Sequence, residues 1–287
     1  MKGMILAGGS GTRLFPATKA ISKQLIPLYD KPMIYYPLSV LMLANIREVL
    51  VITDPKSIEL YKHLLDDGKR FGLEISYEVQ ENPNGLAEAF LIGKNFIDNE
   101  PSALILGDNF FYGNGFGPIL SESSQLSDGA MLFAYRVADP ERFGVVEFNQ
   151  EFKVTSLEEK PKNPKSNYAA TGLYFYDNNA SYYASQLRPS KRGELEITDL
   201  NKTYLNENKL NVNLLGRGFT WLDTGTPQSM FEASTFINII EMKQGIKIAC
   251  LEEIAYRKGW INDKDMMSLI NQGSGPYLDY LKKVIDE

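Results

Sequence analysis

Short apolar runs alternate with longer amphipathic segments over the first half of the chain. Runs of this length between polar or glycine-rich stretches are typical of buried strands, while apolar positions at helical spacing predict helices. The strands are predicted at 4–7, 48–53, 74–79 and 103–106, and the helices at 33–43, 57–66 and 86–96. Strands that alternate with helices favour a mostly parallel sheet covered on both faces. We therefore expect an α/β fold.

The second half of the chain has a different pattern. Its apolar runs follow one another, and the loops between them are rich in lysine, proline and asparagine, so this part is predicted to be β-rich. Strands are predicted at 130–137, 144–148, 153–158 and 172–176, then helices at 230–243, 262–270 and 276–286, with a short strand at 247–251. We expect a core of residues 1–240 and a helical C-terminal segment of residues 241–287.

A glycine-rich loop, Gly8-Gly9-Ser10-Gly11-Thr12-Arg13, follows the first predicted strand directly. Glycine lets the backbone come close to a ligand, and successive exposed N–H groups in such a turn can hold phosphate oxygens. Two well-known phosphate-binding patterns do not fit this loop. The dinucleotide fingerprint requires glycine where Leu14 stands, and the P-loop requires Gly-Lys-Ser/Thr where this loop ends in Thr12-Arg13. The loop is therefore a candidate phosphate site of another kind.

Two other segments, Gln80–Gly85 and Gly107–Asn109, also follow predicted strands. In open parallel sheets ligands bind beyond the carboxyl ends of the strands, so the three loops should share one edge. Asp108 could hold a divalent cation together with substrate phosphates, or it could cap the next helix. The segment Gln80–Gly85 could contact a ligand or form an ordinary turn, because Asn, Pro and Gly favour turns.

Composition narrows the range of functions. The net charge of −6 argues against nucleic acid as the main partner. The single cysteine, Cys250, excludes an internal disulfide framework and is better explained as a small buried hydrophobic residue than as a nucleophile. The only histidine, His63, lies in a polar helical stretch, so a Ser/His/Asp triad or a histidine-based metal site is not expected. Because no apolar run reaches membrane-spanning length, we expect a cytoplasmic protein without membrane contact.

The glycine loop belongs to a longer pattern, Gly-Gly-x-Gly-Thr-Arg-Leu-x-Pro, with Lys23 ten residues after Arg13. This pattern resembles the signature of the sugar-nucleotide pyrophosphorylases, which are nucleotidyltransferases acting on sugar 1-phosphates. The strings at 22–25 and 29–38 resemble the branch that joins dTTP to α-D-glucose 1-phosphate, giving dTDP-glucose and pyrophosphate. The resemblance covers nearly the whole chain. It implies a Rossmann-like fold of the nucleotide-diphospho-sugar transferase type, with a β-rich sugar-binding part and a helical C-terminal part.

The resemblance also implies a nucleotide site. Its residues would be Leu6, Gly8, Gly9, Gly11, Thr12, Arg13, Lys23, Gln24, Gln80, Pro83, Gly85 and Asp108. Gln80 would offer a donor–acceptor pair to the pyrimidine edge. Arg13 would stabilise the leaving pyrophosphate, and Lys23 would hold the α-phosphate. Asp108 would bind Mg²⁺ together with Asp223, which ends a short β-rich run at 218–223.

A second set of residues is implied for the sugar phosphate: Asn109, Gly144, Glu159, Lys160, Thr171, Tyr174, Arg192 and Trp221. Lys160 and Arg192 would hold the phosphate, and Glu159 would accept a hydrogen bond from a sugar hydroxyl. The catalytic residues of the whole site would be Arg13, Lys23, Asp108, Asp223 and Lys160. Phe143 stands where the family usually has tyrosine, so one hydroxyl is lost while the assignment remains.

Regulation and assembly are implied by the same resemblance. Arg217, Glu253 and Arg257 match positions near a second nucleotide site, where a dTDP-sugar could act as feedback inhibitor at a subunit interface of a homotetramer. Gly117 replaces a side chain often found there. Two alternatives stay open: a pyrophosphorylase for another pair, such as UTP or an amino-sugar 1-phosphate, and an inactive sugar-nucleotide sensor. A sensor would be expected to have lost Arg13, Lys23 or an aspartate, and all are present.

Overall fold

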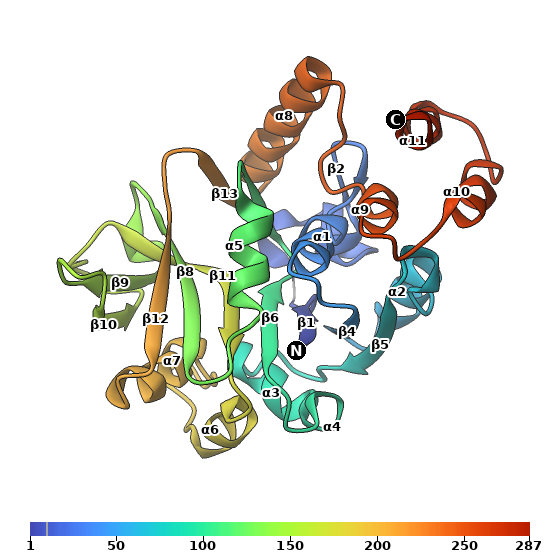
Figure 1. Cartoon of the computed structure of the whole chain (residues 1–287). Coiled ribbons are helices and arrows are strands. Elements are labelled where there is room, and N and C mark those ends of the chain that lie inside the picture. Colours follow the sequence, from blue (N-terminus) through green and yellow to red (C-terminus); the bar gives the residue numbers. More distant parts are fainter. Residues whose placement is uncertain (10) are drawn as a thin grey trace.

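The structure is a computed structural model that describes residues 1–9 and 11–287, and within these residues it forms a nine-stranded central sheet. Strand β1 (Lys2–Leu6) lies at its centre, parallel to β4 (Glu48–Thr53) on one side and to β6 (Ser102–Leu106) on the other. Strand β5 (Glu74–Val79) extends the parallel part beyond β4 (Figure 1). The four strands predicted in the first half of the chain, at 4–7, 48–53, 74–79 and 103–106, are confirmed, as is the α/β class.

The sheet continues with antiparallel pairs into the β-rich half. Strand β11 (Tyr168–Tyr176) pairs antiparallel with β6, β8 (Ala130–Arg136) and β9 (Gly144–Phe148). Strand β10 (Val154–Glu159) pairs with β9, and β12 (Leu210–Leu215) pairs parallel with β8. The β-rich character predicted for this half is confirmed, although β11 begins four residues before the predicted strand at 172.

Helices cover both faces of the sheet, which divides the interior into two main apolar cores. One core includes residues of α1 (Tyr35–Leu43), α2 (Ile58–Leu65) and α5 (Phe116–Ser123). The other includes residues of α3 (Ala89–Ile92), α4 (Lys94–Ile97), α6 (Ala180–Gln186) and α7 (Ile197–Asn206). The helix predicted at 86–96 is interrupted at Gly93, where an added Cβ would lie only 2.7 Å from Met4 Sδ of the central strand.

Two short pairs of strands lie outside the main sheet. Strand β7 (Asn109–Gly113) pairs antiparallel with β13 (Phe219–Asp223), although the two are far apart in sequence. Strand β2 (Pro27–Leu28) pairs with β3 (Lys31–Pro32). The β7–β13 pair matters for function because it brings the end of β13 to the carboxyl end of β6.

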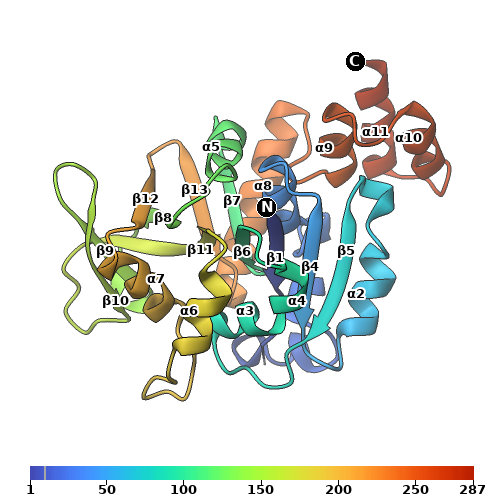
Figure 2. The same ribbon diagram turned by 60° about the horizontal axis from the view of Figure 1, so that its bottom comes forward.

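The C-terminal part is helical, with α8 (Pro227–Gln244), α9 (Leu251–Arg257), α10 (Asp263–Ile270) and α11 (Pro276–Asp286). Figure 2 shows α9, α10 and α11 together at the end of the molecule nearest β5. Helix α8 starts at a capping box formed by Thr226 and Ser229, and it runs through residues 240 and 241, so the division at that point stays a prediction. Across residues 1–9 and 11–287, no helix is long and apolar enough to cross a membrane.

The strand predicted at 247–251 is wrong. Ala249 has a positive φ of 54°, and Cys250 is already the N-cap of α9. The backbone N–H of Ile248 donates to Glu241 Oε1 at 2.9 Å, so this segment is bonded to the end of α8. A strand would instead be bonded to the backbone of a neighbouring strand. The apolar run that suggested a strand is buried, but by packing between helices.

Candidate active site

Three loops meet at one edge of the sheet, as the alternation of strands and helices predicts. Each loop is still bonded to a neighbouring strand where it begins. Ala7 N–H donates to the carbonyl of Ile52 at 2.7 Å, and Gly107 N–H donates to that of Leu6 at 2.9 Å. Gln80 N–H donates to the carbonyl of Thr53 at 2.8 Å. Ser10 of the glycine loop lies outside the described residues.

The glycine loop borders a cavity of about 510 Å³. Five of the residues predicted for the nucleotide line it, namely Gly9, Gly11, Lys23, Gln80 and Pro83. Positive φ angles of 112° at Gly9 and 56° at Gly11 explain why glycine is required in the loop. The other seven predicted residues do not line this cavity: Leu6, Gly8, Thr12, Arg13, Gln24, Gly85 and Asp108.

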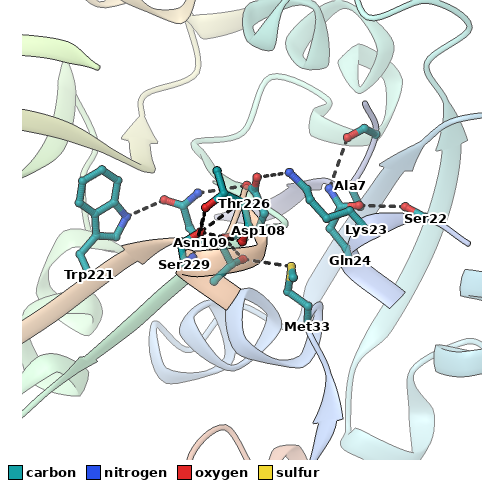
Figure 3. Close-up of polar contacts among 12 residues, drawn as sticks. Ala7, Ser22, Lys23, Gln24, Met33, Asp108, Asn109, Trp221, Thr226 and Ser229 are labelled. Atoms are coloured by element: carbon teal, nitrogen blue, oxygen red, sulfur yellow. Dashed lines mark hydrogen bonds and ion pairs between the residues drawn. The ribbon is translucent and has the colours of Figure 1, made fainter. Parts of the chain in front are cut away.

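Gln24 lies beneath the glycine loop. Its side-chain oxygen accepts hydrogen bonds from Ser22 Oγ at 2.9 Å and from the hydroxyl of Tyr61 at 3.3 Å. Its Nε2 donates to the carbonyl of Gly8 at 3.3 Å. Figure 3 shows Gln24 beside Ser22 and Lys23. Because the whole amide is buried and bonded to the chain, the structure gives Gln24 a role in supporting the loop.

The register of β7 and β13 brings the two predicted metal ligands together. Asp223 lies opposite Asn109, so it is one residue from the position opposite Asp108. The next residue, Thr224, is fully buried and donates to the carbonyl oxygen of Asp108 twice, from its backbone N–H at 3.0 Å and from Oγ1 at 2.6 Å. This double contact holds the ends of the two strands against each other.

Asp108 forms an ion pair with Lys23, drawn in Figure 3. Burial raises the pKa of the Asp108 carboxyl, but the adjacent ammonium of Lys23 outweighs burial and keeps this pKa below its usual range. A further hydrogen bond comes from Asn109 Nδ2 to Asp108 Oδ1 at 3.2 Å. Asp108 is therefore ionised at neutral pH.

Asp223 has the opposite electrostatic environment. Burial and the negative charge of Asp108 raise the pKa of its carboxyl, and the positive charges of Lys23, Arg13 and Arg142 offset this only in part. The Arg13 guanidinium and the Asp223 carboxylate both approach Gly225. A Cβ placed on this glycine would be 2.6 Å from Arg13 Nη2 and 3.0 Å from Asp223 Oδ1. Gly225 thus leaves room for both side chains.

The two aspartates suit a hard divalent cation. Mg²⁺ in proteins usually takes one or two carboxylates together with substrate phosphates and water. Within residues 1–9 and 11–287 no group of three or more His, Cys, Asp or Glu side chains is arranged as a metal site. A metal held by Asp108 and Asp223 would therefore need further oxygen ligands, which phosphates can supply. It would also offset the mutual repulsion that raises the pKa of Asp223.

A second cavity, of about 370 Å³, adjoins the aspartates. It brings together groups predicted for both substrates. The predicted residues that line it are Arg13, Asp108, Asn109, Gly144, Glu159, Lys160, Tyr174, Arg192, Trp221 and Asp223. Thr171 does not line it, whereas its neighbours Ala170 and Gly172 do. The Thr171 hydroxyl is buried and has no hydrogen-bond partner among the described residues.

The basic groups of this cavity are held by acidic neighbours. Arg192 donates to both carboxylate oxygens of Glu196, from Nε at 3.0 Å and from Nη2 at 2.8 Å. Burial raises the pKa of Glu196, but the Arg192 guanidinium outweighs burial and lowers it. Lys160 Nζ lies 3.7 Å from Glu159 Oε1, while Glu159 Oε2 accepts from Thr198 Oγ1 at 2.6 Å.

Trp221 and Asn109 line this cavity beside Asp108, and Figure 3 shows Asn109 between Trp221 and Asp108. Trp221 Nε1 donates to Asn109 Oδ1 at 2.6 Å, and this oxygen also accepts from Gly172 N–H at 3.2 Å. Phe143 packs edge-on against the indole of Trp221, with ring centroids 5.2 Å apart. The amide of Asn109 is therefore used largely within the protein, where it orients Asp108 and Trp221.

Sequence reasoning missed several residues that the structure places at the site. Arg142 and Thr198 line the cavity beside Gly144, and Thr224 and Glu196 hold residues that were predicted. Arg142 is adjacent in sequence to a predicted segment, so its charge was a usable signal. The partnerships of Thr224 and Glu196 depend on tertiary contacts, for which the sequence offers no pattern.

The three residues predicted for regulation are not brought together within one chain. Arg217 lies in the turn between β12 and β13, where it lines a separate cavity of about 640 Å³. Glu253 and Arg257 lie on α9 and form an ion pair of 2.8 Å with each other. Figures 1 and 2 place α9 and the β12–β13 turn on opposite sides of the molecule.

Comparison with known proteins identifies the class of this site. A sequence model of the nucleotidyl transferase family matches residues 2–239, and the chain belongs to this family. Members of the family generally use divalent metal ions. The family resemblance seen in the sequence motifs is therefore confirmed.

Curated relatives are named more narrowly. A glucose-1-phosphate thymidylyltransferase of Neisseria meningitidis is 56% identical over 286 residues, which are 99% of this chain and 99% of the relative. One of Mycolicibacterium smegmatis is 53% identical over 97% of this chain and 98% of the relative. The crystal structure of a UDP-glucose pyrophosphorylase with UDP-glucose has a TM-score of 0.72 at 26% identity, covering 83% of this chain and 98% of that one.

Proposed function

We propose that this chain is a glucose-1-phosphate thymidylyltransferase, which makes dTDP-glucose and pyrophosphate from dTTP and α-D-glucose 1-phosphate. The observation that carries the proposal is the lining of the 370 Å³ cavity, where Arg13, Asp108 and Asp223 meet Lys160 and Arg192. Groups suited to nucleotide phosphates and groups suited to a sugar phosphate thus face one space. The names of relatives above 50% identity support the same activity.

The sugar phosphate would bind in the β-rich half. Lys160 and Arg192 would hold its phosphate. The lysine ammonium is a compact positive charge, and the planar arginine guanidinium can donate to two phosphate oxygens at once. Glu159 would accept a hydrogen bond from a sugar hydroxyl, and Gly144 leaves room for a ring to approach the backbone. Trp221 and Tyr174 would supply flat apolar surface beside the sugar. To bind phosphate, Arg192 would keep its bonds from Nε and Nη2 to Glu196 and from Nη2 to Glu194, and would offer Nη1.

The nucleotide would bind with its phosphates between the glycine loop and the aspartates. A phosphate oxygen of the sugar attacks the α-phosphorus of dTTP in line, the bond to the β-phosphate breaks, and pyrophosphate leaves. Lys23 would hold the α-phosphate, and Arg13 would stabilise the charge on the leaving pyrophosphate. Asp108 and Asp223 would hold Mg²⁺, which when bound neutralises phosphate charge and makes the α-phosphorus more electrophilic. This is catalysis mainly by positioning and charge stabilisation.

A second candidate is a pyrophosphorylase that prefers UTP. The likeness to a UDP-glucose pyrophosphorylase structure favours it, although at lower identity. Thymine and uracil differ by one methyl group, which in a pocket is worth roughly 1–3 kcal/mol. Some turnover with UTP is therefore expected in either case.

Three further properties belong to the proposal. The chain would work as a homotetramer in the cytoplasm. Arg217 would meet Glu253 and Arg257 only across a subunit interface, where a dTDP-sugar could inhibit. Analytical ultracentrifugation with and without a dTDP-sugar such as dTDP-glucose, together with initial rates, would test assembly and inhibition at once.

The activity can be tested by ³¹P NMR of a mixture of the protein, dTTP, α-D-glucose 1-phosphate and Mg²⁺. The proposal predicts the two coupled phosphorus signals of dTDP-glucose and the signal of pyrophosphate, and no reaction in EDTA. Faster formation of UDP-glucose from UTP would move the proposal to the second candidate. Nucleotide binding without any product would favour a sensor and would contradict the catalytic roles.

A further inference from the structure

The side chain of Gln80 reaches the 510 Å³ cavity beside the glycine loop, called the nucleotide cavity below. Both hydrogens of its amide group are already used in hydrogen bonds. Nε2 donates to Glu88 Oε2 at 2.7 Å and lies 3.3 Å from the carbonyl oxygen of Gly85, to which it also donates. An ionised carboxylate and a backbone carbonyl can only accept hydrogen bonds. The end of the amide that faces them must therefore be the NH₂ group, and the orientation of the side chain follows from its surroundings.

Glu88 is itself held in place. It ends the 3₁₀ turn Leu86–Glu88 that leads into α3, and its other carboxylate oxygen accepts from Asn84 Nδ2 at 2.9 Å. Both oxygens of Glu88 are thus engaged within the segment that borders the nucleotide cavity. Gln80 is 7% exposed, so its amide has little freedom to choose other partners.

The free end of Gln80 is its oxygen. A Cβ placed on Gly8 would lie 3.2 Å from Gln80 Oε1, so this atom faces the glycine loop. Within residues 1–9 and 11–287, no group donates a hydrogen bond to Oε1. This oxygen is also not one of the fully buried polar atoms that lack a partner, so it keeps some exposed surface. Gln80 therefore presents an acceptor to the cavity, and the donor–acceptor pair expected from the sequence is reduced to its acceptor half.

We propose that Glu88 is a positioning residue that selects the nucleobase by fixing the amide of Gln80. An acceptor at this position pairs with the N3–H of thymine or uracil and opposes N3 of cytosine, which is itself an acceptor. A buried polar site that leaves two acceptors facing each other is unfavourable, so cytosine nucleotides are rejected. This inference rests on the proposed function, since it concerns the base of the nucleotide substrate.

Because the charged carboxylate of Glu88 can only accept a hydrogen bond, it holds the NH₂ end of the Gln80 amide toward itself and leaves the oxygen for the nucleobase. A glutamine at position 88 could turn its own amide and either donate or accept. Gln80 could then rotate by half a turn and offer NH₂ to a cytosine ring. The substitution Glu88→Gln keeps the size of the side chain and removes the shorter of the two contacts that orient the amide, leaving only the carbonyl of Gly85 at 3.3 Å, which makes it a sharper test than truncation.

The experiment compares dTTP with dCTP for the wild type, Glu88→Gln and the control Glu78→Gln. Glu78 is an exposed carboxylate on β5 and serves as a matched loss of charge. Two readouts are used: kcat/KM with glucose 1-phosphate, and nucleotide affinity by calorimetry without sugar phosphate. We expect Glu88→Gln to lower the ratio of dTTP to dCTP, in kcat/KM and in affinity, by about tenfold or more, which is the scale of one hydrogen bond. Glu78→Gln should leave the preference unchanged.

An equal loss for dTTP and dCTP in Glu88→Gln would mean that Glu88 only supports the loop, and would overturn the inference. A second test uses Gln80→Ala with and without Glu88→Gln. Without the Gln80 amide, Glu88→Gln should no longer change the ratio of dTTP to dCTP. The two readouts separate the inference from the proposed function. A narrowed ratio in calorimetry without turnover by the wild type would support the inference and contradict the function. Normal turnover by the wild type, with a ratio of dTTP to dCTP that Glu88→Gln leaves unchanged, would support the function and contradict the inference.

Discussion

At the scale of single residues, the two aspartates of the site differ in their electrostatic roles. Asp108 has Lys23 beside it, so its pKa is lowered although burial opposes this. Asp223 is buried near Asp108, and both effects raise its pKa. The metal-free chain thus carries one stabilising and one destabilising carboxylate. A buried charge kept for chemistry at a cost in stability is a common feature of active sites.

Replacing Asp223 by asparagine should stabilise the metal-free chain while removing activity. The folded-state pKa of Asp223 lies above its unfolded value, so its ionisation costs stability as the pH rises through these two values. At pH 7 we expect Asp223→Asn to raise the Tm by about 2–4 °C. The gain should shrink as the pH is lowered toward the unfolded value, because the wild-type carboxyl then takes up a proton.

Asp108→Asn is the matched control, with the opposite sign expected. Its pKa is lowered in the fold, so its stabilising effect is present at neutral pH and is lost as the pH falls. The variant leaves Lys23 without its partner, so its Tm in EDTA should fall. Thermal unfolding of both variants in EDTA checks the pair. A fall in Tm for both would show that the environments of the two carboxylates do not differ as described.

Arg13→Ala should slow the chemical step by on the order of 10²–10³, the scale for losing one preorganised charge stabiliser. Arg13 and Asp223 line the same cavity, and both side chains approach Gly225. Rapid-quench measurement of product formation, with substrates saturating, isolates this step from binding. A single-turnover rate equal to that of the wild type would exclude the role given to Arg13.

At the scale of elements, the site depends on the antiparallel pair β7–β13. Its register places Asp223 opposite Asn109, and Thr224 fastens the end of β13 to the carbonyl of Asp108. The separation of the two carboxylates is therefore set by strand pairing and one hydroxyl. This pair lies outside the main sheet, whose parallel part and β-rich half meet at β6 and β11.

Thr224→Val should weaken metal use while leaving the fold intact. Valine keeps the shape of threonine but loses the Oγ1 donor to Asp108, so the carboxylates are held less firmly. We expect the Mg²⁺ concentration for half-maximal activity to rise about tenfold, within the range for residues that orient metal ligands. Thr224→Ser retains the hydroxyl and should behave like the wild type. A Mg²⁺ dependence shared by both variants and the wild type would argue against this role.

The elements also show what the sequence could predict. Strands β1, β4 and β5 are continuous apolar or alternating runs, so local pattern was sufficient. The glycine loop, Asp108 and Lys160 were found through motifs. The segment 247–251 was mistaken for a strand because burial between helices and burial in a sheet select the same residues. Gln24 was assigned to the nucleotide, but its contacts with Ser22 and Gly8 depend on the tertiary fold.

At the scale of the whole molecule, the site consists of two cavities, and the one near the aspartates is lined by groups predicted for both substrates. The parallel strands place the glycine loop and Gln80 at one edge, and the β-rich half places Lys160 and Arg192 across from it. The central claim is that the sugar phosphate attacks the nucleotide directly in this shared space. A covalent nucleotidyl intermediate has no part in the account.

The most direct test is exchange of labelled pyrophosphate into dTTP, measured with Mg²⁺ and with or without glucose 1-phosphate. A direct attack needs the sugar phosphate to release or recapture pyrophosphate. Label should therefore enter dTTP when glucose 1-phosphate is present, and none should enter without it. Label that enters dTTP without the sugar phosphate would reveal a covalent intermediate and contradict the mechanism. The absence of label in both mixtures would contradict the activity itself.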